Sequence, residues 1–225
     1  YASDNDDRLP PHSNAESSLQ SASGLFGAPR AWCVADVPGQ PADVFRESFL
    51  GPYLGGVSQI GGCPTWDPPQ EYIDDLHSFP GFPKLPPIDY AYNGRMLGVP
   101  GPDGPARWIG FRTFDLRSPT STILVADSAV HLPGYPGELA FTLEFELQPP
   151  VADTYARRAG ASPTSEGGTV HNRHAGKANT LWADAHATSE FVRLEESNQI
   201  EQRLGIGDLY DGDTPNNDWW DGGYR

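Results

Sequence analysis

Proline and glycine most limit what this chain can form, because both residues interrupt regular secondary structure. The 225 residues include 23 prolines and 25 glycines, with no fixed period. They are densest around "CPTWDPPQEYIDDLHSFPGFPKLPPIDYAYNG", where the prolines exclude long helices and central strands. Six Trp, nine Tyr and ten Phe are spread along the chain, which favours a packed, loop-rich fold over disorder.

The distribution of apolar residues predicts one α+β domain with four consecutive parts. Residues 1–60 are expected to form loops and a short helix over 42–54. Residues 61–117 are expected to be irregular, with a turn or hairpin tip at "VPGPDGPARW". An antiparallel sheet is predicted within 118–205, and an acidic tail over 206–225.

Four β-rich runs and one helix are predicted in the C-terminal half. The run "LAFTLEFEL" alternates apolar and polar residues, as a strand with one face toward water does. The predicted strands are 120–128, 139–147, 178–185 and 187–194, and the predicted helix covers 194–204 and ends at Gly205.

Charge narrows the possible partners. Thirty acidic and fifteen basic residues give a net charge of −15, which disfavours binding to nucleic acid and to anionic membrane surfaces. Several carboxylate and amide side chains in the tail offer the oxygen ligands that calcium prefers, although the glutamate that ends an EF-hand loop is missing. The predicted calcium ligands are Asp208, Asp211, Asp213, Asn216 and Asp218, with a solvated acidic terminus as the alternative.

Cys33 and Cys63 are the only cysteines. An even pair without a CxxC motif predicts one disulfide, closing a loop of about thirty residues. Two buried thiols are the alternative. A disulfide would favour an oxidising location, extracellular or at the cell surface.

The run "HNRHAGKANTLWADAHATSEF" concentrates potential chemistry. If the protein were a zinc-dependent hydrolase, this run would supply the ligands His171, His174, Asp184 and His186. However, the sequence has neither an HExxH motif nor a recognisable nucleophile turn. Glycine and asparagine in "RHAGKAN" favour a tight turn instead, with polar side chains bonded to the backbone. Asp127, at the end of "TILVADS", is expected to act as a cap, with contact to His174 or His186 as the alternative.

The order of residues in "RHAGKANTLWADAH" resembles the H-X9-DG domain of prepilin-like proteins, the pilin and pseudopilin relatives of type IV pili and type II secretion. The matching positions are His174, Asn179, Asp184 and His186. The segments "YASDNDDRLP", "CP", "YAYNG" and "SPTSTILVADS" also occur in the family order, so the resemblance spans nearly the whole chain. Ala185 replaces the family glycine, and the turn after Asp184 is therefore expected not to need a positive φ.

The resemblance implies a non-enzymatic subunit of an extracellular pilus-like filament or secretion pseudopilus. Its partners would be copies of itself or other pilin-like subunits, and the four matched residues would be structural. Membrane contact would come only through the family's N-terminal hydrophobic helix, which this sequence lacks. The family's calcium site strengthens the prediction for the tail. The alternatives are a secreted calcium-dependent carbohydrate-binding module, using Trp219 and Trp220, and the zinc-dependent hydrolase.

Overall fold

The part of the chain that the structure describes lies mostly in the C-terminal half. The computed structural model describes residues 7–9, 63, 89–93, 96–101, 104–110, 112–131, 140–141, 147, 149–150, 169–194 and 198–220. The predicted helix over 42–54 and Cys33 lie outside these residues.

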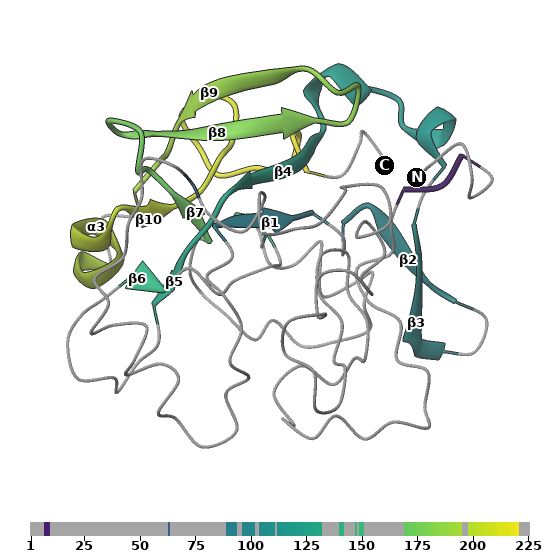
Figure 1. Cartoon of the computed structure of the whole chain (residues 1–225), viewed down its shortest axis with the longest axis horizontal. Coiled ribbons are helices and arrows are strands. Elements are labelled where there is room, and N and C mark those ends of the chain that lie inside the picture. Colours follow the sequence, from purple (N-terminus) through teal and green to yellow (C-terminus); the bar gives the residue numbers. More distant parts are fainter. Residues whose placement is uncertain are drawn as a thin grey trace.

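A four-stranded antiparallel sheet organises the described residues (Figure 1). Its order is β1 (Tyr90–Tyr92), β4 (Ile123–Asp127), β8 (Lys177–Trp182) and β9 (Ala187–Phe191). Strands β4, β8 and β9 confirm the strands predicted over 120–128, 178–185 and 187–194. The α+β class with a C-terminal antiparallel sheet is therefore confirmed for the described residues.

Three short antiparallel ladders accompany the sheet. They pair β2 (Gly98–Gly101) with β3 (Gly104–Gly110), β5 (Val130–His131) with β6 (Ala140–Phe141), and β7 (Val170–His171) with β10 (Ile206–Gly207). Two 3-10 turns, η5 (Thr113–Asp115) and η6 (Pro119–Ser121), precede β4.

The segment 61–117, expected to be irregular apart from a turn or hairpin tip, contains three strands, β1, β2 and β3. Prolines are tolerated in the β2–β3 hairpin because both strands of a two-stranded ladder are edges. The register also shifts between Pro100 and Gly101. The pairing of β2 with β3 agrees with the hairpin predicted at "VPGPDGPARW", whose tip at 102–103 lies outside the described residues.

The run 139–147 is described only in part. Strand β6 (Ala140–Phe141) pairs with β5 and not with the main sheet. Leu147 is fully buried, and its N–H donates to the Tyr92 carbonyl at 3.0 Å. The intervening residues 142–146 lie outside the described residues.

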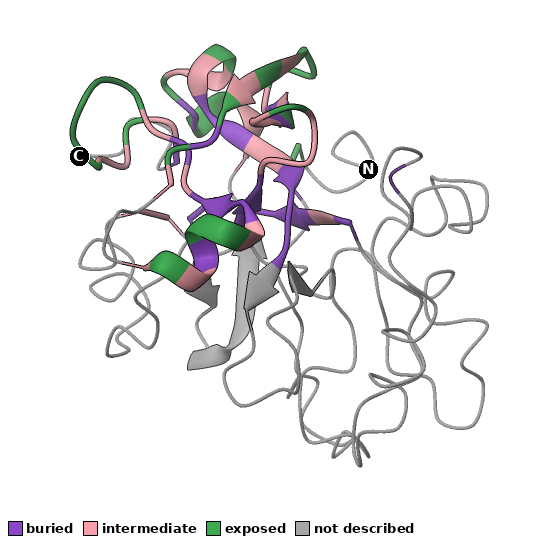
Figure 2. Cartoon of the chain, turned by 90° about the vertical axis from the view of Figure 1, so that its left-hand side faces the viewer, coloured by how far each residue is buried: buried purple, intermediate pink, exposed green. Residues whose placement is uncertain are grey.

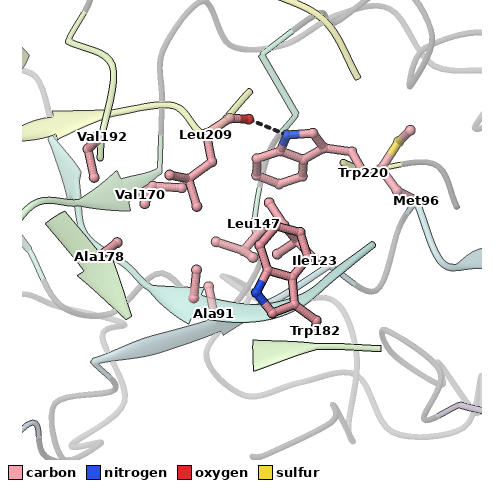
Figure 3. Packing of buried hydrophobic residues seen from close by; sticks show 11 residues of the cluster. Ala91, Met96, Ile123, Leu147, Val170, Ala178, Trp182, Val192, Leu209 and Trp220 are labelled. Carbon is pink, nitrogen blue, oxygen red and sulfur yellow. Dashed lines mark hydrogen bonds between the residues drawn. The ribbon is translucent and has the colours of Figure 1, made fainter. Parts of the chain in front are cut away.

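The main core packs the C-terminal segment against the sheet (Figure 3). Trp220 is fully buried, and its Nε1–H donates to the Leu209 carbonyl at 2.6 Å. The side-chain amide of Asn93 donates to the carbonyls of Ile123 and Trp220, both at 2.9 Å. The cluster consists of Ala91, Met96, Ile123, Ala126, Leu147, Val170, Ala178, Trp182, Val192, Leu209 and Trp220.

Helix α3 (Gln199–Leu204) is shorter than the predicted 194–204 but ends where expected. Asn198 caps its start by accepting from the Glu201 N–H at 3.2 Å. Gly205 ends it with a φ of 72°, and a Cβ there would lie 2.0 Å from Asn172 Oδ1. One side of α3 is exposed (Figure 2). In the described part of the chain, the helices fall short of the length and hydropathy that crossing a bilayer requires.

A two-residue loop leads into β8. The N–H of His174 donates to the Lys177 carbonyl at 3.1 Å, and the N–H of Lys177 donates back at 3.2 Å. Between them Ala175 and Gly176 have φ values of 55° and 87°, the signature of a type I′ turn. The tight turn predicted in "RHAGKAN" is confirmed.

The loop between β8 and β9 corrects a prediction. The Ala185 N–H donates to the Trp182 carbonyl at 2.9 Å, and the Trp182 N–H donates to the His186 carbonyl at 2.9 Å. This three-residue loop requires a left-handed residue in its last position, and Ala185 supplies it with a φ of 73°. The expectation that this turn avoids a positive φ is wrong, because the strand pairing fixes the loop geometry despite the Cβ.

Replacing Ala185 by glycine is expected to stabilise the protein. Glycine removes the steric strain that the Cβ causes in a left-handed residue. It also raises the conformational entropy of the unfolded chain, which offsets part of this stabilisation, and the net gain is about 0.5–1 kcal/mol. Ala187→Gly is the matched control, because Ala187 lies in β9 without a positive φ. Chemical denaturation should show a higher unfolding free energy for Ala185→Gly and a lower one for Ala187→Gly. Equal effects would contradict the strain argument.

Candidate functional site

Strand pairing brings two carboxylates to one end of the sheet. Tyr90 in β1 pairs with Asp127, the last residue of β4. Asp89 immediately precedes β1, and its carbonyl accepts from the Ser128 N–H at 2.9 Å. Both Asp89 and Asp127 are buried. Two buried carboxylates in one place require compensation by cations or hydrogen bonds.

Arg173 supplies the compensating charge from the segment that precedes β8. Its side chain is 0% exposed, with Nη1 3.1 Å from Asp89 Oδ1 and Nε 3.9 Å from Asp127 Oδ1. Its Nη2 also donates to the Ser128 carbonyl. One buried guanidinium therefore joins both carboxylates to the chain that follows β7.

His171 completes the surroundings of Arg173 as a neutral ring. Its Nδ1 accepts from Arg173 Nε at 3.0 Å, so the ring proton is on Nε2, which donates to the Leu204 carbonyl at 3.0 Å. Burial, and then the charge of Arg173, lower the pKa of His171 to about 4. Both ring nitrogens of His171 therefore have hydrogen-bond partners within the protein.

Asp127 is also the contact point for β8 and the turn before it. Its Oδ2 accepts from the Asn179 N–H at 2.6 Å and lies 3.1 Å from His174 Nε2. Burial raises the pKa of Asp127, although the Asn179 N–H, Arg173 and His174 oppose this shift. Of the two uses predicted for Asp127, the structure favours contact with His174 across the sheet.

Cys63 faces the same histidine. It is a buried thiol, with its N–H donating to Asp89 and its Sγ 3.6 Å from His174 Nε2. The structure shows Cys63 as a thiol. Cys33 lies outside the described residues, and the Cys33–Cys63 disulfide therefore stays a prediction. Burial raises the pKa of Tyr90 to about 12, and the neighbouring Cys63 and Asp127 add to the shift.

The matched residues of the H-X9-D motif fall into two places. His174 and Asn179 lie beside Asp127, with Asn179 Nδ2 2.9 Å from His174 Nε2 and Asn179 Oδ1 accepting from the Ser189 hydroxyl at 2.7 Å. Asp184 and His186 instead form an exposed pair at the loop after β8, 2.5 Å apart. The spacer between the two places is strand β8, and a strand advances about 3.3 Å per residue.

The ligand set of the predicted zinc hydrolase is therefore not assembled. His171 is bonded to Arg173 and Leu204, His174 lies with Cys63 and Asp127, and the loop pair is at the other end of β8. Within the described residues, one group of three His, Cys, Asp or Glu side chains brings its ligand atoms together. That group is Cys63, Asp127 and His174, with ligand atoms within 4.8 Å of one another.

The group does not form a nucleophilic triad. Cys63 and Asp127 both approach Nε2 of His174. A triad needs the nucleophile on one ring nitrogen and the orienting carboxylate on the other, so that the imidazole passes a proton between them. The arrangement fits a metal ligand set better than a catalytic base.

The acidic tail forms an exposed loop in which the side-chain amide of Asn216 bonds to the backbone of the loop itself. Asn216 Nδ2 donates to the carbonyls of Asp211 and Thr214 at 2.6 and 3.1 Å, and its Oδ1 accepts from the Asp218 N–H at 3.1 Å. The backbone of Asp208 pairs with Arg193. Calcium binding by Asp208, Asp211, Asp213, Asn216 and Asp218 stays a prediction.

Of the two tryptophans proposed for carbohydrate binding, Trp220 is buried and Trp219 is partly buried. Trp220 is fully buried, and Trp219 lies edge-on to Trp182 at 5.3 Å between ring centroids. Trp182 also stacks on His186 at 5.6 Å. Trp220 therefore has no face to offer a sugar ring, and the carbohydrate-binding alternative loses one of its two aromatic residues.

Sequence reasoning missed two residues of this site, Asp89 and Arg173. Neither lies in a recognisable motif, since Asp89 follows the proline-rich segment and Arg173 is one of several charges near the histidines. Only the contact of Asp127 with His174 had a signal, the position of an aspartate at the end of an apolar strand.

Comparison of the chain with family models, curated proteins and solved structures finds no match.

Replacing Arg173 by methionine is expected to destabilise the protein by about 3–5 kcal/mol, because it leaves two buried carboxylates without their cation. Arg193→Met is the matched control and should cost about 1 kcal/mol or less, since Arg193 is exposed. Adding Asp89→Asn to Arg173→Met should restore part of the loss. Unfolding free energies from denaturant titration measure all three. No recovery in the double variant would contradict the charge argument.

His171 should make the protein sensitive to acid. Its pKa falls from the ordinary 6.5 to about 4 on folding, so below pH 6.5 the unfolded chain takes up a proton that the folded protein rejects. This contribution to stability is full above pH 6.5 and decreases by about 1.4 kcal/mol per unit as the pH falls to about 4. Chemical denaturation in the presence of a metal chelator should show that the unfolding free energy of the wild type exceeds that of His171→Gln by an amount that decreases as the pH falls across this range. A constant difference would refute the assignment.

Proposed function

We propose that this chain is a non-enzymatic structural subunit of an extracellular pilus-like filament or secretion pseudopilus. It would assemble with copies of itself or with related pilin-like subunits. The observation that carries the proposal is the use made of the motif residues: His174 and Asn179 brace a hairpin, and Asp184 and His186 order its loop. Side chains with these roles maintain a shape, as a structural subunit requires.

Strand β9 is the surface that best suits assembly. It is the last strand of the described sheet (Figure 1). Its residues alternate between exposed and partly buried positions. Phe191 at its end is 64% exposed, with Lys177 Nζ 4.3 Å from its ring centroid. An edge strand can accept a strand from another chain through main-chain hydrogen bonds, while apolar side chains add contact area.

Charge sets the conditions for this assembly. Subunits with a net charge of −15 repel one another, and salt screens the repulsion over about 10 Å at 0.1 M. A filament of this protein should therefore form more readily as ionic strength rises, in contrast to assemblies held together by surface ion pairs.

Assembly of the purified chain tests the proposal. Sedimentation and negative-stain microscopy across a salt series should show filaments whose amount increases with salt. Phe191→Ser should raise the protein concentration needed for assembly by about tenfold, corresponding to about 1.4 kcal/mol of lost contact.

Phe114→Ser is the matched control, because Phe114 is also 64% exposed but lies in η5, away from the sheet edge. It should leave the required concentration unchanged. If the protein stays monomeric at high protein and salt concentrations, the proposal is wrong. Equal effects of the two variants would reject the β9 surface.

A further inference from the structure

We propose that Cys63, Asp127 and His174 bind a zinc-class divalent metal ion that ties the segment around residue 63 to the sheet. The proposal concerns the inside of one subunit, so it stands or falls separately from filament assembly. The three residues come from distant parts of the chain, and His174 follows Cys63 at a sequence separation of 111. An ion held by all three would act as a cross-link.

The separations of the ligand atoms fit one tetrahedral ion. Zinc bonds of about 2.3 Å to sulfur and 2.0–2.2 Å to nitrogen and oxygen imply edges of about 3.6 Å for S···N and 3.4 Å for N···O. Cys63 Sγ and His174 Nε2 are 3.6 Å apart, and His174 Nε2 and Asp127 Oδ2 are 3.1 Å apart. Of these two edges, the second must lengthen by a few tenths of an ångström, and the third, from Cys63 to Asp127, lies within 4.8 Å.

The chemistry of the three atoms also favours an ion. Sulfur, carboxylate oxygen and imidazole nitrogen each have a lone pair to offer, and all three lie within 4.8 Å. A single proton on Nε2 can form a good hydrogen bond with only one of its two acceptor neighbours. A cation can accept a lone pair from the sulfur, the oxygen and the nitrogen at once. Thiolate and imidazole select zinc and related transition metals over calcium, which prefers oxygen ligands.

Charge and surroundings agree with a divalent ion. A thiolate at Cys63 and carboxylates at Asp89 and Asp127 would be balanced by Arg173 and one divalent cation. The ligands are held by further contacts, since Asp127 accepts from the Asn179 N–H and Cys63 donates its N–H to Asp89. Such outer contacts orient metal ligands before the ion arrives. Asn179 Nδ2, 2.9 Å from Nε2, would have to turn aside.

Metal analysis of the full chain tests the proposal. The reduced protein, treated with chelator and then with excess zinc, should retain one ion per chain after gel filtration. Cobalt in place of zinc should give the thiolate charge-transfer band in the near ultraviolet and the visible bands of a tetrahedral ion. Cys63→Ser should abolish the charge-transfer band, while Cys33→Ser should retain it.

The histidines provide a second matched pair. His174→Gln should weaken zinc binding by about 100-fold or more, because it removes a ligand and not merely an outer contact. His186→Gln, at the exposed loop after β8, should leave affinity unchanged. Far-ultraviolet circular dichroism identifies any variant that fails to fold, and the Cys63→Ser spectrum then decides. Absence of bound metal in the folded wild type, a Cys63 disulfide in the native protein, or binding lost equally in His186→Gln would overturn the site.

Discussion

The fold of the described residues depends on one buried cation, Arg173, held between Asp89 and Asp127. Taking three charges out of water costs several kcal/mol for each ion, and only close pairing offsets that cost. The carboxylates are fixed at one end of β1 and β4, so the guanidinium can reach both only if the chain after β7 crosses that end. A strand slipped by one residue would leave a charge buried and uncompensated. The arrangement therefore selects one register as well as contributing contacts.

The contacts of Arg173 determine where the residues after it lie. With Arg173 fixed, the type I′ loop at Ala175 and Gly176 reverses the chain and lays β8 beside β4. The same reversal places His174 against Asp127, and the Asn179 N–H supplies a second bond to that carboxylate. The polar cluster and the sheet therefore form together, and neither is complete without the other.

The strands and turns were predictable because their signals are local. Apolar β-branched runs identified β4, and glycine marked the loop at Gly176. The contacts of Cys63 with Asp89 and His174 could not be predicted, because a cysteine in a sequence carries no information about which groups surround it in space. The turn at Ala185 failed for a related reason: residue preference favours glycine there by about 1 kcal/mol, and pairing of β8 with β9 outweighs that. Asp89 and Arg173 were missed because a charged residue looks the same in sequence whether it is buried or exposed.

The H-X9-D spacing was informative in an unexpected way. Nine residues between His174 and Asp184 invite the interpretation that both bind one ion, but a spacer that forms an extended strand holds its two ends apart. What the spacing specifies is the length of a hairpin arm, with a buried anchor at one end and an ordered loop at the other. Chemistry at the buried end then depends on residues outside the motif, Cys63 and Asp127, which are drawn there by the sheet. A cysteine engaged in a disulfide has no thiolate to give a metal, so oxidation and metal binding at Cys63 exclude each other, and the redox state of the surroundings decides between them.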